Sequence, residues 1–352
     1  MVAALSQQIT QKINKGVVIP AHPLALTEKR TLDERRQVAL TRYYLSAGAG
    51  GIALGVHTTQ FEIHDRKSGL YKPVLELGSR TISEYEQIKK TEGPVIRIAG
   101  VVGKTKQAVE EAYIAKSLGY HAVLLSLSAF KGATNNEMLQ HVQEVAKVMP
   151  VFGFYLQISV GGVLLNYDFW RRFAEIENVV AIKIAPFNRY QTVDVVRAIA
   201  DSGREIALYT GNDDNIVNDL CTRFKFGNRT LRIVGGLLGH WACWTLRAVE
   251  ILRRIHSLVE SDNSIPSYML SLGVEITDCN AAIFDAANNF AGCIPGIHEI
   301  LRRQGFLKGV WTLNEDEGLS AGQKEEIDRI YRMYPHLNDD EFVSEHLDEW
   351  LK

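Results

Sequence analysis

A lysine stands in the middle of an apolar stretch of the chain. Residues 179–187 read VVAIKIAPF, so Lys183 is flanked on both sides by residues typical of a buried strand. Lysine is almost never fully buried unless its charge is paired or its amine is used. A dry site favours the neutral amine, which can attack a carbonyl carbon and form a Schiff base. Two interpretations are open: a nucleophile, or a core lysine paired with a carboxylate.

A tyrosine lies in the preceding apolar stretch, VFGFYLQ at residues 151–157. Side chains alternate between the two faces of a strand. If Lys183 faces inward, the same parity places Tyr155 and Gln157 on the inner face of the neighbouring strand. A phenol beside the amine can pass protons to and from a substrate. We therefore expect Tyr155 and Lys183 to approach each other.

Strand-like and helix-like segments alternate along most of the chain and must position these two side chains. Short, β-branched apolar segments are each followed by an amphipathic helical pattern. The predicted strands cover residues 16–22, 51–56, 95–101, 122–127, 151–157, 179–185, 205–211 and 232–238. The predicted helices cover residues 31–48, 83–90, 106–119, 136–149, 167–177, 192–203, 214–227 and 244–260.

Eight such units predict parallel strands joined by right-handed crossovers and closed into a (β/α)8 TIM barrel. An open, doubly wound sheet is the alternative. The active site of such a barrel lies at the C-terminal ends of its strands. Helical patterns without strands follow, so we expect a barrel domain over 1–260 and a helical extension over 261–352 packed on it.

The composition excludes several classes of protein. The 352 residues carry a formal net charge of -2, from 39 basic and 41 acidic residues, which argues against a dedicated binder of nucleic acid or membrane surfaces. No apolar run reaches the roughly 18 residues that a membrane-spanning helix needs. The four cysteines form no C-x-x-C pair, and the N-terminus lacks a long apolar signal region. We expect a cytoplasmic protein without a metal or an organic cofactor.

Several motifs resemble those of one enzyme family. YLQISVGG, ENVVAIKIAPF, YTGNDD and IPGIHEILRRQGFLKG are similar to segments of the dihydrodipicolinate synthase and N-acetylneuraminate lyase family of pyruvate-dependent class I aldolases. The resemblance runs from about Gly16 to the C-terminal helices. It implies that Lys183 forms the Schiff base and that Tyr155 is the acid and base. Gly211, within YTGNDD, would let a ligand approach the backbone.

The loop after the second predicted strand departs from the family pattern. It reads GVHTTQFE, which places His57 and Thr58 at the two positions where the family has hydroxyl side chains. The resemblance implies that Thr58 holds the carboxylate of the keto acid, aided by the Thr59 amide. A shifted placement that uses Thr58 and Thr59 is also open. His57 would bind substrate, carry a proton or have a structural role.

Other departures concern the second substrate. Phe130 stands where the dihydrodipicolinate synthases have a second tyrosine, and Val160 stands where they have an arginine. His22 replaces a common Thr-Pro pair at the end of the first strand and either lines the mouth of the site or has a structural role. These differences argue against dihydrodipicolinate synthesis.

The resemblance therefore implies a lyase that acts on pyruvate or a related 2-keto acid, with a second substrate other than aspartate semialdehyde. A hydratase-aldolase or dehydratase of a sugar acid or an aromatic keto acid is the alternative, as is a catalytically weak keto-acid sensor. The family further implies a homo-oligomer, either a dimer or a tetramer.

Overall fold

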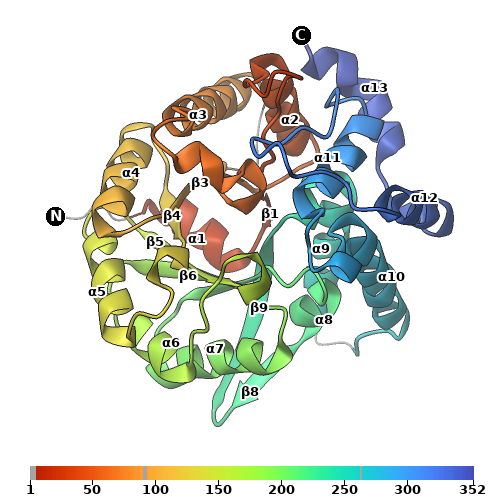
Figure 1. Ribbon diagram of the computed structural model, residues 1–352. Helices are drawn as coiled ribbons and strands as arrows, with labels where there is room; N and C mark the ends of the chain where they lie inside the picture. The colour runs from red at the N-terminus through yellow and green to blue at the C-terminus, as the bar shows by residue number, and fades with distance from the viewer. Residues whose placement is uncertain (1–4, 90–92, 262–263) are drawn as a thin grey trace.

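Eight parallel strands form a ring at the centre of the molecule (Figure 1). The computed structural model describes residues 5–89, 93–261 and 264–352. The strands follow the order β1-β9-β7-β6-β5-β4-β3-β2, and a bridge between Ala21 and Ala53 joins the two ends. The predicted (β/α)8 barrel is confirmed. Its strands are β1 (Val18–Pro20), β2 (Gly51–Leu54), β3 (Ile96–Val101), β4 (Ala122–Leu125), β5 (Val151–Leu156), β6 (Val179–Ala185), β7 (Ala207–Thr210) and β9 (Arg229–Leu238).

Two apolar layers hold the ring together. Alternate strand residues such as Phe152, Ala181 and Tyr209 pack inside the barrel, where the rings of Phe152 and Tyr209 lie 5.2 Å apart. The intervening residues pack outward against the helices. Helix α1 (Gln7–Lys15) buries Ile9 and Ile13 in the inner layer, and its Ile13 carbonyl accepts a 2.8 Å hydrogen bond from the Tyr209 hydroxyl.

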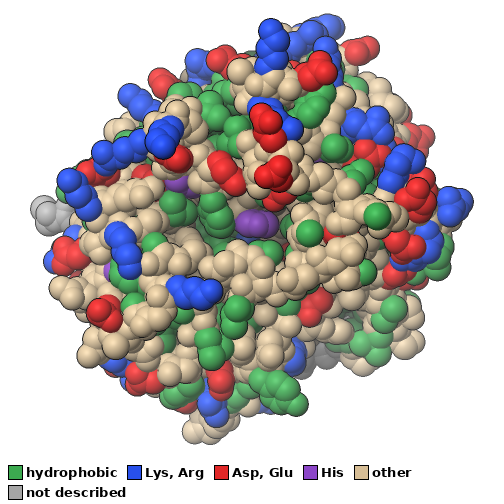
Figure 2. All heavy atoms as spheres, in the orientation of Figure 1, with side chains coloured by type: hydrophobic (Ala, Val, Ile, Leu, Met, Phe, Trp, Pro, Cys, Tyr) green, Lys and Arg blue, Asp and Glu red, His purple; other side chains and the backbone are tan. Residues whose placement is uncertain are grey.

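The outer layer consists of amphipathic helices, as the alternation predicts. They are α2 (Glu34–Ser46), α3 (Tyr71–Ile88), α4 (Thr105–Ser117), α5 (Asn135–Ala146), α6 (Tyr167–Phe173), α7 (Arg189–Ser202), α8 (Ile216–Cys221) and α9 (Thr245–Glu260). Among the described residues, no helix is both long enough and apolar enough to cross a membrane. Charged side chains of both signs lie toward the rim of the face in Figure 2, and a histidine and hydrophobic side chains lie nearer its centre.

The helix predicted over residues 214–227 is wrong in its second half. Helix α8 ends at Cys221, and β8 (Arg223–Phe226) pairs antiparallel with β9. Within β8, Phe224 is buried whereas Arg223 and Lys225 are exposed. This alternation has the period of a strand. Gly227, at a φ of 54°, makes the turn into β9.

The C-terminal helices pack along one side of the barrel beside α2 and α9 (Figure 1). They are α10 (Tyr268–Ile283), α11 (Cys293–Arg303), α12 (Gln323–Met333) and α13 (Asp340–Trp350). The buried Tyr43 of α2 packs its ring 4.9 Å from Phe306 and 5.5 Å from Trp350. Its hydroxyl donates a 2.7 Å hydrogen bond to Asp339, which also accepts from the Leu246 amide. The extension is therefore anchored to the barrel by apolar packing and by a buried polar cluster.

Candidate active site

Lys183 points into the barrel from the C-terminal half of β6. Its side chain is 7% exposed, and its Nζ lies 4.5 Å from the centre of the Phe154 ring. Among residues 5–89, 93–261 and 264–352, none makes a hydrogen bond or an ion pair with this amine. The structure therefore contradicts the interpretation of Lys183 as a core lysine that is paired with a carboxylate.

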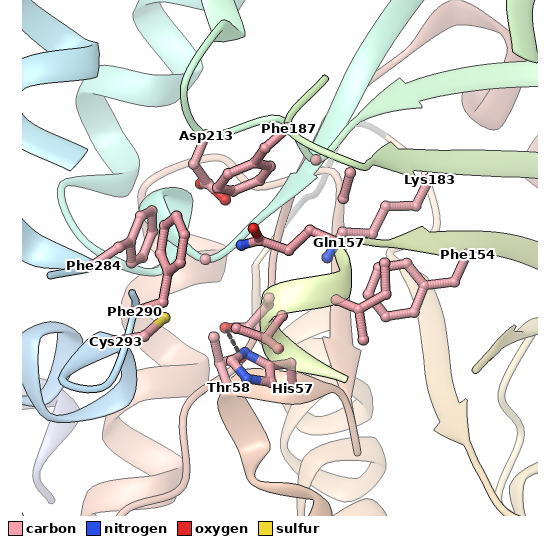
Figure 3. Close-up of a pocket in the computed structure, with 16 residues that line it drawn as sticks. His57, Thr58, Phe154, Gln157, Lys183, Phe187, Asp213, Phe284, Phe290 and Cys293 are labelled. Carbon is pink, nitrogen blue, oxygen red and sulfur yellow. Dashed lines mark hydrogen bonds between the residues drawn. The ribbon is translucent and has the colours of Figure 1, made fainter. Parts of the chain in front are cut away.

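The amine lines a cavity of about 50 Å³. Figure 3 shows Phe154 on one side of Lys183 and Phe284 and Phe290 across the cavity. The cavity is small and mostly apolar, with a few polar groups directed into it. Its lining includes Ala21, His57, Thr58, Phe154, Leu156, Gln157, Val160, Lys183, Ala185, Phe187, Gly211, Asp213, Gly239, Phe284, Phe290 and Cys293.

Burial shifts the proton affinity of two facing groups in opposite directions. Burial lowers the pKa of Lys183, and the Asp213 carboxylate opposes this effect. Burial likewise raises the pKa of Asp213, and the Lys183 ammonium opposes it. The structure shows no ion pair between the two side chains. Removal from water therefore dominates both groups, lowering the pKa of Lys183 to about 8 and raising the pKa of Asp213 to about 7, so that each can exchange its proton near neutral pH.

Asp213 follows β7 and is held by two neighbouring elements. Its Oδ1 accepts a 3.2 Å hydrogen bond from the backbone N–H of His240, in the short helix η5 (His240–Ala242). Its backbone carbonyl accepts a 2.6 Å bond from the Asn280 side chain of α10. The N-cap of α8 is Asn215, and no group of three or more metal-binding side chains is found in the described part of the chain.

His57 and Thr58 reach the cavity from the short helix η1 (His57–Thr59). Burial, aided by the charge of Lys183, lowers the pKa of His57 to about 4, so its ring is neutral at neutral pH. The Thr58 hydroxyl donates a 2.7 Å hydrogen bond to the Ala21 carbonyl. This bond fixes the loop against the end of β1.

Thr59 does not line the cavity. Its hydroxyl donates to the His22 carbonyl at 2.7 Å, and its amide donates to the Val56 carbonyl at 2.9 Å. The amide that the family resemblance offers for the substrate carboxylate is therefore already engaged. Of the two placements of this loop, the unshifted one with His57 and Thr58 matches the cavity.

Gly211 makes the position of Lys183 possible. A Cβ at residue 211 would lie 2.6 Å from Cε and 3.0 Å from Cγ of Lys183, and 2.8 Å from Cβ of Ala185. Real Cβ atoms do not approach other atoms so closely. The glycine thus leaves the space that the lysine side chain occupies.

The predicted approach of Tyr155 to Lys183 is wrong. In the β5–β6 pairing, Val151 pairs with Val179 but Phe152 pairs with Ala181, so β6 holds one extra residue at this bulge. Because paired residues of neighbouring strands point to the same face, Lys183 faces Phe154. Tyr155 points outward, with its ring 5.4 Å from Trp170 of α6 and its hydroxyl accepting from the Leu165 amide at 3.2 Å.

His22 and Phe130 also lie away from the cavity. His22 is fully buried under α2, where its Nε2 is 2.9 Å from the Thr41 hydroxyl and its ring packs edge-on against Tyr44. The Phe130 ring packs at a tilt against His141, with 4.4 Å between the ring centres, and the Lys104 amine lies 4.3 Å from the centre of the Phe130 ring. Of the two interpretations of His22, the structural role matches its place in the core. The expected contribution of either side chain to the substrate site has no support in the geometry.

Several lining residues were not predicted from the sequence. The C-terminal extension contributes Phe284, Phe290 and Cys293, and the loop after β6 contributes Phe187. The rings of Phe187 and Phe290 meet edge to face at 5.7 Å. Asp213 was not predicted to line the cavity either, but it follows the predicted apolar strand 205–211 by two residues, and this position at the C-terminal end of a strand could have identified it.

Comparison with known proteins supports the fold and the family. Residues 16–223 match the Dihydrodipicolinate synthetase family. A 4-hydroxy-tetrahydrodipicolinate synthase of Marinobacter nauticus is 32% identical over 145 residues, which are 40% of this chain and 48% of the relative. A probable 5-dehydro-4-deoxyglucarate dehydratase of Acinetobacter baumannii is 28% identical over 142 residues, which are 39% of this chain and 45% of the relative. The match thus spans about half the length of these curated relatives.

Solved structures share the fold over nearly the whole chain. The dihydrodipicolinate synthase of Acinetobacter baumannii, crystallised with pyruvate, has a TM-score of 0.72 at 18% identity and covers 90% of this chain and 98% of its own. The N-acetylneuraminate lyase of Fusobacterium nucleatum has a TM-score of 0.70 at 16% identity and covers 92% of this chain and 99% of its own.

Proposed function

This chain belongs to the dihydrodipicolinate synthetase family, and from that premise we propose that it is a class I lyase in which Lys183 forms a Schiff base with pyruvate or a related 2-keto acid. The observation that carries the proposal is the amine itself. It is buried, it has no ion-pair or hydrogen-bond partner among the described residues, and it faces a cavity at the C-terminal ends of the strands. Activity in barrels of this type resides at that end.

The polar groups around the amine suit a keto acid. The neutral amine adds to the C2 carbonyl, and loss of water gives an iminium that withdraws electrons from C3. The first N–H groups of a helix have no acceptor within the helix, so the amides of His57 and Thr58 are available to the carboxylate. The Gln157 side chain makes no hydrogen bond within the described residues and points into the same cavity (Figure 3). It would donate to the carboxylate as well.

Borohydride reduction in the presence of pyruvate tests this proposal. We expect a covalent adduct on the peptide that contains Lys183 and none in Lys183→Met. Lys104→Met is the matched control, because Lys104 also lies over a phenylalanine ring but does not line the cavity. An adduct confined to other lysines, or an unmodified Lys183, would show that the amine is not the nucleophile.

The walls of the cavity favour an apolar second substrate. Four phenylalanines surround the amine, and Val160 stands where an arginine would grip a second carboxylate. This favours the hydratase-aldolase reaction of an aromatic keto acid over the dehydration of a sugar acid, whose hydroxyls would meet few partners here. Product analysis with aromatic aldehydes and with sugar acids, each supplied with pyruvate, separates the two reactions. If the protein binds pyruvate but turns over no second substrate, the keto-acid sensor is the remaining interpretation.

The assembly and location of the protein follow from the same premise. We propose a cytoplasmic homo-oligomer, a dimer or a tetramer, as the family resemblance implies. Light scattering coupled to size-exclusion chromatography measures the assembly. A monomer at micromolar concentration would contradict it.

A further inference from the structure

The cavity has an amine but lacks the phenol that the sequence led us to expect. Tyr155 lies outside the barrel wall, and Phe154 takes its place. Proton transfer in the Schiff-base reaction therefore needs another group. Among the described residues that line the cavity, the other titratable side chains are Asp213, His57 and Cys293.

We propose that Asp213 is the catalytic acid and base of the reaction at Lys183. This inference rests on the proposed function, because it assigns the proton transfers of the same Schiff base. Its carboxyl group faces the cavity from the end of β7, opposite the amine (Figure 3).

The carboxyl group is held in one orientation. The His240 amide binds Oδ1 at 3.2 Å, and Asn280 fixes the backbone carbonyl of the same residue. No other residue in the described part of the chain donates a hydrogen bond to this carboxyl group. Lys183 and Asp213 line the same cavity and form no ion pair with each other. Such an arrangement positions a proton donor without locking it to the amine.

The charges around Asp213 allow both of its protonation states. Lys183 faces it and favours the carboxylate, whereas burial and the neighbouring Asp214 favour the acid and raise its pKa. The other titratable neighbours are neutral, because burial lowers the pKa of His240 to about 4 and raises the pKa of the Cys293 thiol. A carboxyl group balanced in this way can give and take a proton near neutral pH.

The other two candidates are poorly suited. The pKa of His57 is lowered to about 4, so at neutral pH its neutral ring is a weak base, and its N–H is a far weaker acid than a carboxylic acid. The buried Cys293 thiol remains protonated and cannot accept a proton from carbon. Asp213 is the side chain of the cavity that can act in both directions.

The proton transfers balance as follows. The Lys183 amine adds to C2 of the keto acid, and the amine proton moves to the former carbonyl oxygen. The protonated Asp213 then donates a proton to the departing hydroxyl, which leaves as water while the C2–N double bond forms. The resulting Asp213 carboxylate removes a proton from C3, and that electron pair forms the C2–C3 double bond of the enamine as the iminium becomes a neutral amine.

Exchange of the C3 protons of pyruvate for deuterium isolates this last step and can be followed by proton NMR at saturating pyruvate. We expect Asp213→Asn, which keeps an oxygen for the His240 amide, to slow exchange by about 100-fold or more. The variant should still form the borohydride-trapped adduct on Lys183 during long incubation. Asp348→Asn, which removes an exposed carboxylate of α13 that does not line the cavity, should exchange at the wild-type rate.

The outcomes separate the two proposals. Exchange by Asp213→Asn within a few fold of wild type overturns the role of Asp213 and leaves the Schiff base intact. Failure of the wild type to form any adduct overturns the proposed function, and the role of Asp213 with it. If Asp213→Asn does not fold, the pH dependence of exchange by the wild type is the test. An exchange rate that falls as the pH drops below neutrality supports a carboxylate base, and a rate that stays constant below neutrality refutes it.

Discussion

Gly211→Ala should displace the Schiff-base lysine while leaving the barrel folded. The added methyl carbon would lie 2.6 Å from Lys183 Cε, whereas an ordinary van der Waals contact begins at 3.4 Å. The lysine side chain must therefore move by about 0.8 Å, and the contact of 2.8 Å with Cβ of Ala185 also requires a small shift between residue 211 and β6. The glycine does not adopt a positive φ, so the substitution acts through space and not through backbone strain.

Gly211→Ala should decrease the rate of adduct formation strongly and the folding stability only modestly. Overpacking of this kind costs about 1–3 kcal/mol of folding free energy, which a barrel with such an extensive core tolerates. A reacting atom misplaced by about 1 Å can cost about 100-fold in rate. We therefore expect the rate of adduct formation with pyruvate and borohydride to fall by about 100-fold, with a modest decrease in Tm.

Two measurements check this reasoning. Time-resolved mass spectrometry gives the rate of adduct formation, and thermal unfolding gives the stability. Gly318→Ala is the matched control, since a Cβ there meets no atom within 4 Å. Adduct formation at the wild-type rate by Gly211→Ala would mean that the amine does not react from the position seen here.

Three further predictions concern residues at and away from the cavity. Tyr155→Phe should keep adduct formation and exchange within about twofold of wild type and lose about 1 kcal/mol of stability, measured by denaturant unfolding, because its hydroxyl serves only the Leu165 amide. A large decrease in the exchange rate would show that Tyr155 takes part in the reaction. Burial lowers the pKa of His22 to about 4. The unfolded chain then binds more protons between pH 4 and the ordinary histidine pKa near 6.5, so His22 alone should lower the free energy of unfolding by roughly 3 kcal/mol as the pH drops through this window. Other buried histidines titrate in the same window, so His22→Asn should make the slope of the stability profile smaller by the share of one histidine, and an unchanged slope would contradict this. Phe290→Ala should widen the cavity and raise kcat/KM for a bulky aldehyde relative to a small one by about 10-fold. No change in this ratio would show that Phe290 does not limit the second substrate.

The sequence was sufficient for the architecture of the barrel. Eight repeats of an apolar strand and an amphipathic helix leave few arrangements that bury both faces of every strand, and the closed ring is the simplest. Helix α8 is the exception. The alternating residues of β8 are too few to distinguish a strand from a continuation of the preceding helix, because the segment is short and lies between two regular elements.

Within the site, the sequence located the amine and the glycine beside it. Lys183 stands out because a charged residue in an apolar strand demands an explanation. Gly211 and Thr58 follow β7 and β2, whose C-terminal ends converge at one rim of the barrel. The sequence of β5 carries no such signal, since residues on both of its faces are buried and either face could be turned inward.

What the sequence determined is the ring of strands and the presence of an amine that has no place in an ordinary core. The tertiary structure decided what faces that amine. One extra residue in β6 places Phe154, and not Tyr155, on the inner face beside Lys183. Side chains alternate between the two faces of a strand, so a single bulge reverses which residues of β5 share a face with Lys183. Packing of the C-terminal extension then brings Phe284, Phe290 and Cys293 to the cavity of Lys183, which lies more than 100 residues before them in the chain. Such contacts depend on how distant elements dock, which no local pattern of residues encodes.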